Sequence, residues 1–247
     1  MKIILENISK TFGEQKVLDG LDLAIESKKI TFIIGQSGGG KSVLLKHIIG
    51  LVKPDSGRVL VDDIDISSLN EAGLNEIRKN FGMLFQDAAL FDSMTVGENV
   101  AFPLNEHRRL PKNEVERIVT EKLLQVGLTG VTQKMPSELS GGMRKRVGLA
   151  RALALDPKII LFDEPTTGLD PIMCDAIDQL IVETQQRTGA TCVVISHDIE
   201  STFKIAHRVA MLYSGKIIAY GSAKDIRSSD NPVLRQFVEC KFIPENS

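Results

Sequence analysis

The sequence predicts an α/β fold in which a mostly parallel β-sheet is flanked by helices. Three observations predict it: short apolar runs alternate with helical segments, a glycine-rich loop joins one run to a helix, and another run ends in two acids. Apolar strands that are continuous rather than alternating are typical of parallel sheets covered on both faces. A length of 247 residues fits a single domain with subdomains.

The first third of the chain contains short strands and one strand-loop-helix unit. Apolar runs interrupted by Gly13 and Glu14 predict the first strands. Apolar residues at helical spacing follow the glycine-rich loop, and Pro54 with Gly57 are expected to end that helix. The expected strands span 2–8, 17–25, 30–34, 58–61 and 81–85, and the expected helices span 43–51 and 70–79.

The pattern changes between residues 87 and 155. This stretch holds charged helical segments and no convincing strand, so we expect a helical subdomain. Alternating units then return, and Ser214-Gly215 predicts a hairpin between the last two strands. The expected helices span 112–126, 142–155, 172–187 and 199–206, and the expected strands span 159–162, 191–195, 209–213 and 216–220.

Composition excludes several classes of protein. Lys and Arg total 30 against 32 Asp and Glu, so the excess positive field of a nucleic-acid binder is missing. Cys174, Cys192 and Cys240 are widely spaced and predict reduced thiols. No apolar run approaches the roughly 18 to 20 residues that cross a bilayer, and the N-terminus turns polar too early for a signal peptide. We expect a soluble chain that reaches a membrane only through partners.

A phosphate-binding loop is the most specific local motif. One segment fits the pattern GxxxxGK[ST]: Gly35, Gln36, Ser37, Gly38, Gly39, Gly40, Lys41 and Ser42. Glycines let backbone N–H groups and the following helix N-terminus, which includes Val43, face phosphate oxygens. Lys41 would bridge the outer phosphates and the Ser42 hydroxyl would bind Mg²⁺. A plain glycine turn is the alternative, but the flanking strand and helix argue against it.

A second group of polar residues follows two later strands. Asp163 and Glu164 end the apolar run 159–162, at the carboxyl edge where open α/β sheets bind ligands. Asp163 can hold a metal ion, and Glu164 can accept a proton from the water that attacks the γ-phosphate. His197 follows the strand over 191–195 and could donate a hydrogen bond to the γ-phosphate, although a histidine at a strand end is more often structural.

The segment Leu139 to Arg146, LSGGMRKR, resembles the LSGGQ signature of ATP-binding cassette (ABC) proteins. In physical terms this segment is typical of a helix N-terminus. Ser140 would cap the helix, while Gly141 and Gly142 would permit close approach of an anion. The phosphate loop already serves one nucleotide, so a second anion site suggests binding of an ATP held by a neighbour. The resemblance implies two cassettes closing head to tail over two ATP molecules.

Further positions resemble other landmarks of this family. Gln86 matches the glutamine that contacts Mg²⁺ and senses the permease, and His197 matches the switch histidine. Asp170 lies in a segment similar to the loop along the dimer seam, and Phe12 lies where an aromatic ring stacks on adenine. Two positions depart from the family pattern, Met143 for a signature glutamine and Gly39 for a common serine in the phosphate loop.

The resemblance covers nearly the whole chain and implies its fold. We expect a RecA-like P-loop NTPase core with an N-terminal antiparallel β subdomain and an inserted helical subdomain. The implied division of residues 1–247 is a core over 1–86 and 156–225, a helical subdomain with the signature over 87–155, and a C-terminal tail over 226–247. The implied ligands are ATP and Mg²⁺.

Four segments most resemble Mla-type ATPases, which move phospholipid between bacterial inner and outer membranes: 35–51, 85–104, 139–153 and 231–237. This resemblance implies a second copy of the chain, an integral-membrane permease, and MCE-type and STAS-type subunits as partners. It implies a location on the cytoplasmic face of the inner membrane. Residues 88–103 would receive the permease, with Leu90, Phe91 and Met94 either lining that groove or forming core.

Several alternatives stay open at the level of sequence. The tail from Ser228 is either disordered or reaches the other cassette, with Phe237 and Phe242 as anchors. An importer of a small polar solute such as an amino acid is the rival transport function. A soluble cassette protein acting on DNA or ribosomes would carry a long coiled coil or a second cassette, and a regulator without turnover would lack residues such as Lys41 and Glu164.

Overall fold

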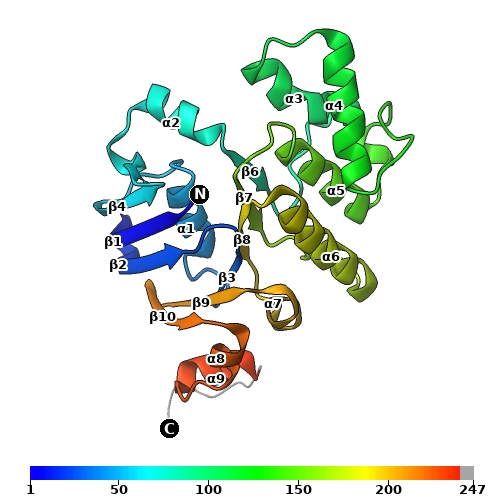
Figure 1. The fold of residues 1–247 in the computed structure, drawn as a ribbon. Coiled ribbons are helices and arrows are strands. Elements are labelled where there is room, and N and C mark those ends of the chain that lie inside the picture. The colour runs from blue at the N-terminus through cyan, green and yellow to red at the C-terminus, as the bar shows by residue number, and fades with distance from the viewer. Residues whose placement is uncertain (240–247) are drawn as a thin grey trace. The chain divides into compact units, whose positions relative to one another are not determined.

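A computed structural model describes residues 1–239 (Figure 1). The chain divides into two compact units. Unit 1 comprises Met1 and residues 69–194, and unit 2 comprises residues 2–68 together with the chain from residue 195. Both units combine strands with helices, which confirms the predicted α/β class. Among the described residues, no helix has the length and apolar character that a bilayer crossing needs.

Unit 2 contains an antiparallel sheet in the order β2-β1-β4-β5. Its strands are β1 (Ile3–Phe12), β2 (Gln15–Ile25), β4 (Ser56–Val61) and β5 (Ile64–Asp65). Ile3 of β1 lies opposite Ile25 on one side and Val61 on the other, and all three side chains are fully buried. Alternate residues of the strands therefore form one face of a core, as expected for an antiparallel sheet.

Unit 2 also contains the strands β3 (Ile30–Ile34), β9 (Arg208–Tyr213) and β10 (Lys216–Gly221), in the order β10-β9-β3. β3 pairs with β9 in parallel and all five of its residues are buried, which explains its continuous apolar sequence. β9 and β10 form the predicted hairpin, in which Ser214 and Gly215 both have positive φ (46° and 76°). Two residues with positive φ are what a type I′ turn requires.

The helices of unit 2 are α1 (Lys41–Ile48), the 3-10 turn η1 (Ile66–Ser68), α7 (Ile199–Ile205), α8 (Ala223–Arg227) and α9 (Pro232–Val238). The expected end of the first helix at residue 51 is wrong. Gly50 adopts a left-handed conformation (φ 72°), and its N–H donates to the carbonyl oxygen of His47. A left-handed glycine ends the helix before Pro54 is reached.

The C-terminal segment folds at least as far as α9. Asn231 caps this helix by accepting hydrogen bonds from the N–H groups of Val233 and Leu234, and the Leu234 side chain is fully buried. Leu234 is thus the buried anchor, while Phe237 is half-buried and Phe242 lies outside the described residues. Crossing of the tail to a second copy remains a prediction.

Unit 1 contains three neighbouring strands in the order β8-β7-β6. They are β6 (Phe81–Leu84), β7 (Ile159–Asp163) and β8 (Thr191–Ile195), whose last residue, Ile195, already belongs to unit 2. β6 and β7 run parallel, with Phe81 opposite Ile159. The long helix α6 (Pro171–Thr188) connects β7 to β8. Cys192 on β8 is buried and Cys174 on α6 is partly buried, and neither of these two described cysteines forms a disulfide, whereas Cys240 lies outside the described residues.

The remaining helices of unit 1 are α2 (Glu71–Arg78), α3 (Val96–His107), α4 (Lys112–Gln125), the 3-10 turn η2 (Pro136–Glu138) and α5 (Gly141–Ala152). No strand interrupts residues 87–155, all of which the structure describes. α3 was not among the expected helices, although Thr95 and Glu98 form a capping box at its start. α5 ends at Ala152, three residues before the expected position.

Candidate functional site

The phosphate loop connects β3 to α1 in unit 2. Helix α1 begins at Lys41, directly after Gly40. The Lys41 side chain is buried, and its Nζ donates to the carbonyl oxygens of Gly35 at 2.8 Å and Gln36 at 2.9 Å. The ammonium group therefore lies against the backbone of the phosphate loop, where it would contact a bound phosphate.

Two glycines fix the path of this loop. At Gly35 (φ 151°) a Cβ atom would lie 2.3 Å from the carbonyl oxygen of Leu212, and at Gly40 (φ 92°) it would lie 2.9 Å from Val17 Cγ1. Gly38 also has positive φ (75°), but a Cβ there would meet nothing within 4 Å. The N-terminal N–H groups of α1 have no partner within the helix, so this cradle fits an anionic phosphate.

His197 lies in the same unit as the phosphate loop. The N–H of the preceding Ser196 donates to the carbonyl oxygen of Ile33 in β3 at 3.4 Å, so Ser196 lies beside the strand that leads into the loop. The His197 side chain is exposed. Asp198 caps α7 by accepting a hydrogen bond from the N–H of Ser201 at 3.0 Å, which fixes the turn that presents the histidine.

Phe12 ends β1 and has a ring that is 48% exposed. The Lys10 ammonium lies 5.5 Å from the ring centroid. A large exposed aromatic ring on the surface of a strand is available for stacking by a base. Its role as the adenine platform remains a prediction.

Asp163 and Glu164 lie in unit 1, at the end of β7. Residues Ile159 to Phe162 are fully buried, and Glu164 then adopts a left-handed backbone conformation (φ 49°). Its Oε2 accepts a hydrogen bond from the Thr167 hydroxyl at 3.1 Å. A left-handed conformation in a residue other than glycine costs about 1–3 kcal/mol and is found most often at functional sites.

The signature segment forms the start of α5 as predicted. Ser140 is the N-cap, and its Oγ accepts a hydrogen bond from the N–H of Met143 at 3.3 Å. At Gly142 a Cβ atom would lie 2.2 Å from Met173 Cε of α6, the flexible end of a side chain that can move aside. Gly141 and Gly142 are the first two residues of the helix and leave its N-terminus open to an anion.

Asp170 is the N-cap of α6. Its Oδ1 accepts hydrogen bonds from the N–H groups of Ile172 at 3.0 Å and Met173 at 3.1 Å. Pro171 occupies the first helical position, and an Asp-Pro pair is a common start to a helix. This local signal is readable in the sequence and gives the carboxylate a structural task within its own chain, while the predicted place of Asp170 along a dimer seam stays a prediction.

Lys145 of α5 is a site residue that the sequence analysis missed. Its side chain is buried, and its Nζ donates to the carbonyl oxygens of Pro165 at 2.7 Å and Thr167 at 2.6 Å. Burial lowers its pKa, while Asp87, Cys174 and Glu164 act in the opposite direction. A lysine in a charged helix is usually solvated, so no pattern in the sequence could have revealed these contacts.

Gln86 follows β6 and is exposed. Beyond it, a groove of about 320 Å³ is lined mainly by aromatic and apolar side chains. Its lining includes Phe81, Phe85, Phe91, Phe102, Pro103 and Arg151. The rings of Phe91 and Phe102 lie 4.7 Å apart between centroids. Phe91 lines this groove, whereas Leu90 and Met94 are not among its lining residues. Binding of a permease here stays a prediction.

Within residues 1–239 no cluster of three or more His, Cys, Asp or Glu side chains is placed to hold a metal ion. The predicted Mg²⁺ ligands are instead the Ser42 hydroxyl, the Gln86 amide and the Asp163 carboxylate. All three supply oxygen atoms, which Mg²⁺ prefers, and Mg²⁺ commonly takes only one or two protein ligands alongside phosphate and water. The donor chemistry fits Mg²⁺ bound together with a nucleotide.

Comparison with known proteins gives a consistent result. The family model described as ABC transporter matches residues 18–167. The intermembrane phospholipid transport system ATP-binding protein MlaF of Escherichia coli K12 is 43% identical over 235 residues, which are 95% of this chain and 87% of that protein. The probable ribonucleotide transport ATP-binding protein mkl of Mycobacterium tuberculosis H37Rv is 42% identical over 243 residues, 98% of this chain and 68% of that protein.

A solved structure shares the fold. The dimeric ATP-binding cassette MJ0796, in a post-hydrolysis state bound to ADP and Pi, superposes with a TM-score of 0.82 at 33% identity. The match covers 90% of this chain and 98% of that one.

Proposed function

The chain belongs to the ABC transporter family, and from this premise we propose that it is the ATP-hydrolysing subunit of a transporter that moves phospholipid between the inner and outer membranes. One observation carries the catalytic part of the proposal. Glu164 stands at the end of the buried strand β7 in a left-handed conformation, with its carboxylate held by the Thr167 hydroxyl. A fixed carboxylate at the carboxyl edge of a strand suits a general base.

The other residues have defined tasks in this reaction. The phosphate loop binds the β- and γ-phosphates through backbone N–H groups and Lys41. Glu164 accepts a proton from the attacking water, while His197 donates a hydrogen bond toward the γ-phosphate. Mg²⁺, when bound beside Ser42 and Asp163, would neutralise charge on the phosphate oxygens.

A second copy of the chain completes the site. The N-terminus of α5, with Ser140, Gly141 and Gly142, provides a second anion cradle. The phosphate loop already binds the phosphates of the chain's own ATP, so this second cradle is available to another nucleotide. Two copies placed head to tail would each offer this cradle to the ATP of the other. The dimeric state of the related cassette MJ0796 supports this arrangement.

The groove beside Phe91 is the proposed contact with a membrane-embedded permease. Its apolar and aromatic lining suits a short amphipathic helix. MCE-type and STAS-type subunits complete the proposed assembly, on the cytoplasmic face of the inner membrane. The likeness to MlaF supports phospholipid as cargo, and the likeness to mkl makes a ribonucleotide the rival cargo.

Glu164→Gln tests the catalytic assignment, because the amide keeps the shape of the side chain and loses its basicity. We expect the variant to bind ATP with wild-type affinity, to lose turnover by roughly 100-fold or more, and to accumulate as a closed dimer in size-exclusion chromatography with ATP. Turnover at the wild-type rate would refute Glu164 as the base. Identification of lipid or nucleotide that co-purifies with the chain and its permease decides between the two cargoes.

A further inference from the structure

Lys145 connects the signature helix to the loop that follows the proposed catalytic base. It projects from the second turn of α5, and its ammonium group is enclosed within unit 1 with two backbone carbonyl oxygens, of Pro165 and Thr167, as hydrogen-bond partners. Enclosing a charge is costly unless hydrogen bonds compensate it. These two bonds, at 2.7 and 2.6 Å, therefore hold both the lysine side chain and the loop that contains Pro165 and Thr167.

The contact continues from the loop to Glu164. Thr167 accepts a hydrogen bond from Lys145 through its carbonyl oxygen and donates one from its hydroxyl to Glu164 Oε2. The Thr167 N–H also donates to the Glu164 carbonyl oxygen at 3.3 Å. A short turn thus runs from the left-handed Glu164 to Thr167, and Lys145 holds its far end in place.

We infer that Lys145 is a positioning residue for ATP hydrolysis: it fixes Thr167, which in turn orients the Glu164 carboxylate toward the attacking water. The inference rests on the proposed function, because it assumes that Glu164 is the base. Lys145 lies five residues after Ser140, about 7.5 Å along the helix axis at 1.5 Å per residue. A shift of the anion cradle on binding the partner's ATP would therefore be carried by a rigid helix to the base of the same chain.

This arrangement has a kinetic consequence for the dimer. Each signature helix would contact one ATP, while the Glu164 that it positions acts on the other. Binding of ATP at one site would then change, through Lys145, the orientation of Glu164 at the other site. ATP hydrolysis by the wild-type dimer is expected to be cooperative in ATP concentration, and loss of Lys145 is expected to lower the Hill coefficient toward 1.

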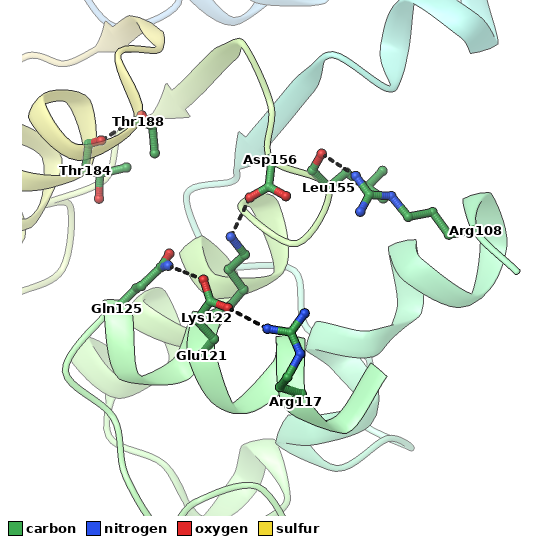
Figure 2. A network of polar contacts seen from close by, with 9 residues as sticks. All are labelled: Arg108, Arg117, Glu121, Lys122, Gln125, Leu155, Asp156, Thr184 and Thr188. Atoms are coloured by element: carbon green, nitrogen blue, oxygen red, sulfur yellow. Dashed lines mark hydrogen bonds and ion pairs between the residues drawn. The ribbon is translucent and has the colours of Figure 1, made fainter. Parts of the chain in front are cut away.

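The test compares substitutions in the full-length chain. Lys145→Met removes the ammonium and keeps the length of the side chain, and Thr167→Val removes the hydroxyl and keeps the shape. Lys122→Met is the matched control, because Lys122 is equally buried (6% exposed, as is Lys145) but donates to Asp156 at 2.5 Å in a separate network between α4 and the loop before β7 (Figure 2).

We expect Lys145→Met and Thr167→Val each to lower kcat by roughly 10- to 100-fold, with ATP affinity changed less than about threefold, because a displaced base slows proton transfer without altering the phosphate loop. Thr167→Ser should restore most of the turnover, since it keeps the hydroxyl. The double variant should lose no more than the worse single variant, because both residues act through one contact. Lys122→Met should keep the kcat of the wild type.

The outcomes separate this inference from the function on which it rests. If Glu164→Gln abolishes turnover while Lys145→Met and Thr167→Val both hydrolyse ATP like Lys122→Met, the positioning role is wrong and the proposed function stands. Multiplicative losses in the double variant would also overturn it. If Glu164→Gln hydrolyses ATP normally, the assignment of the base fails instead. Should Lys145→Met fail to fold, the kcat values of Thr167→Val and Thr167→Ser decide the question. Equal kcat values for these two variants would overturn the positioning role.

Discussion

Arg151 Nη2 donates a hydrogen bond to the carbonyl oxygen of Ala88 at 2.7 Å. Its Nη1 donates to the next carbonyl oxygen, that of Ala89, also at 2.7 Å. Both alanines have positive φ (61° and 47°), so the chain after Gln86 follows an unfavourable path. The planar guanidinium bonds two successive carbonyl groups at once, and this geometry stabilises a conformation that alanine rarely adopts.

Arg151→Lys should destabilise unit 1 because an ammonium keeps the charge but cannot reproduce the two-pronged contact. We expect the free energy of unfolding to fall by about 1–3 kcal/mol, the cost of losing a hydrogen bond between a charged group and a partly buried carbonyl oxygen. Urea denaturation measures it. Arg117→Lys on the exposed face of α4, where the guanidinium contacts Glu121, should change stability by less than about 0.5 kcal/mol. Equal effects of the two changes would contradict the interpretation.

Gly35→Ala and Gly38→Ala separate two reasons for glycine in the phosphate loop, a positive φ and a lack of space for a Cβ atom. Both glycines have positive φ, but only at Gly35 would the new Cβ lie against a backbone atom, 2.3 Å from the Leu212 carbonyl oxygen. Gly38→Ala should therefore cost only about 1–2 kcal/mol of backbone strain. Gly35→Ala should lower the melting temperature clearly further. Thermal unfolding without nucleotide measures both, and equal melting temperatures would show that the loop at Gly35 can move aside.

Ser140 offers a contrast between stability and function. Ser140→Ala removes the oxygen that accepts from the Met143 N–H, and should cost about 1 kcal/mol of helix stability. Ser140→Arg should bind ATP in the isolated chain as the wild type does and should stop hydrolysis, because a large side chain blocks the cradle for the partner's ATP. Nucleotide titration and phosphate release measure the two properties. Unchanged hydrolysis by Ser140→Arg would mean that no ATP sandwich forms.

His47 predicts a pH dependence of stability. It is buried on α1, its Nδ1 lies 2.7 Å from the Val43 carbonyl oxygen, and burial lowers its pKa below the usual value. A histidine whose pKa is lower in the folded state favours folding above its unfolded pKa of about 6.5 and loses that contribution as the pH falls. Between pH 7.5 and 5, the wild type should therefore lose more unfolding free energy than His47→Phe. Parallel pH profiles in denaturant titrations would contradict this.

The sequence determined the features that depend on neighbouring residues. Continuous apolar runs predicted β3 and β7, Ser214-Gly215 predicted the hairpin turn, and Ser140 predicted the N-cap of α5, because periodicity, positive φ and capping act within a few residues. The phosphate loop, the signature segment and the acids after β7 were also visible as motifs. Their assigned roles stay predictions that the experiments above test.

Tertiary structure decided which side chains are enclosed and what they meet. Lys145 and Arg151 belong to one charged helix, yet their partners lie 20 to 63 residues away in sequence. Asp170 caps the N-terminus of its own helix, and its place along a dimer seam stays a prediction. Local patterns cannot fix such contacts, because the cost of burying a charge and the hydrogen bonds that offset it depend on segments brought together only by packing.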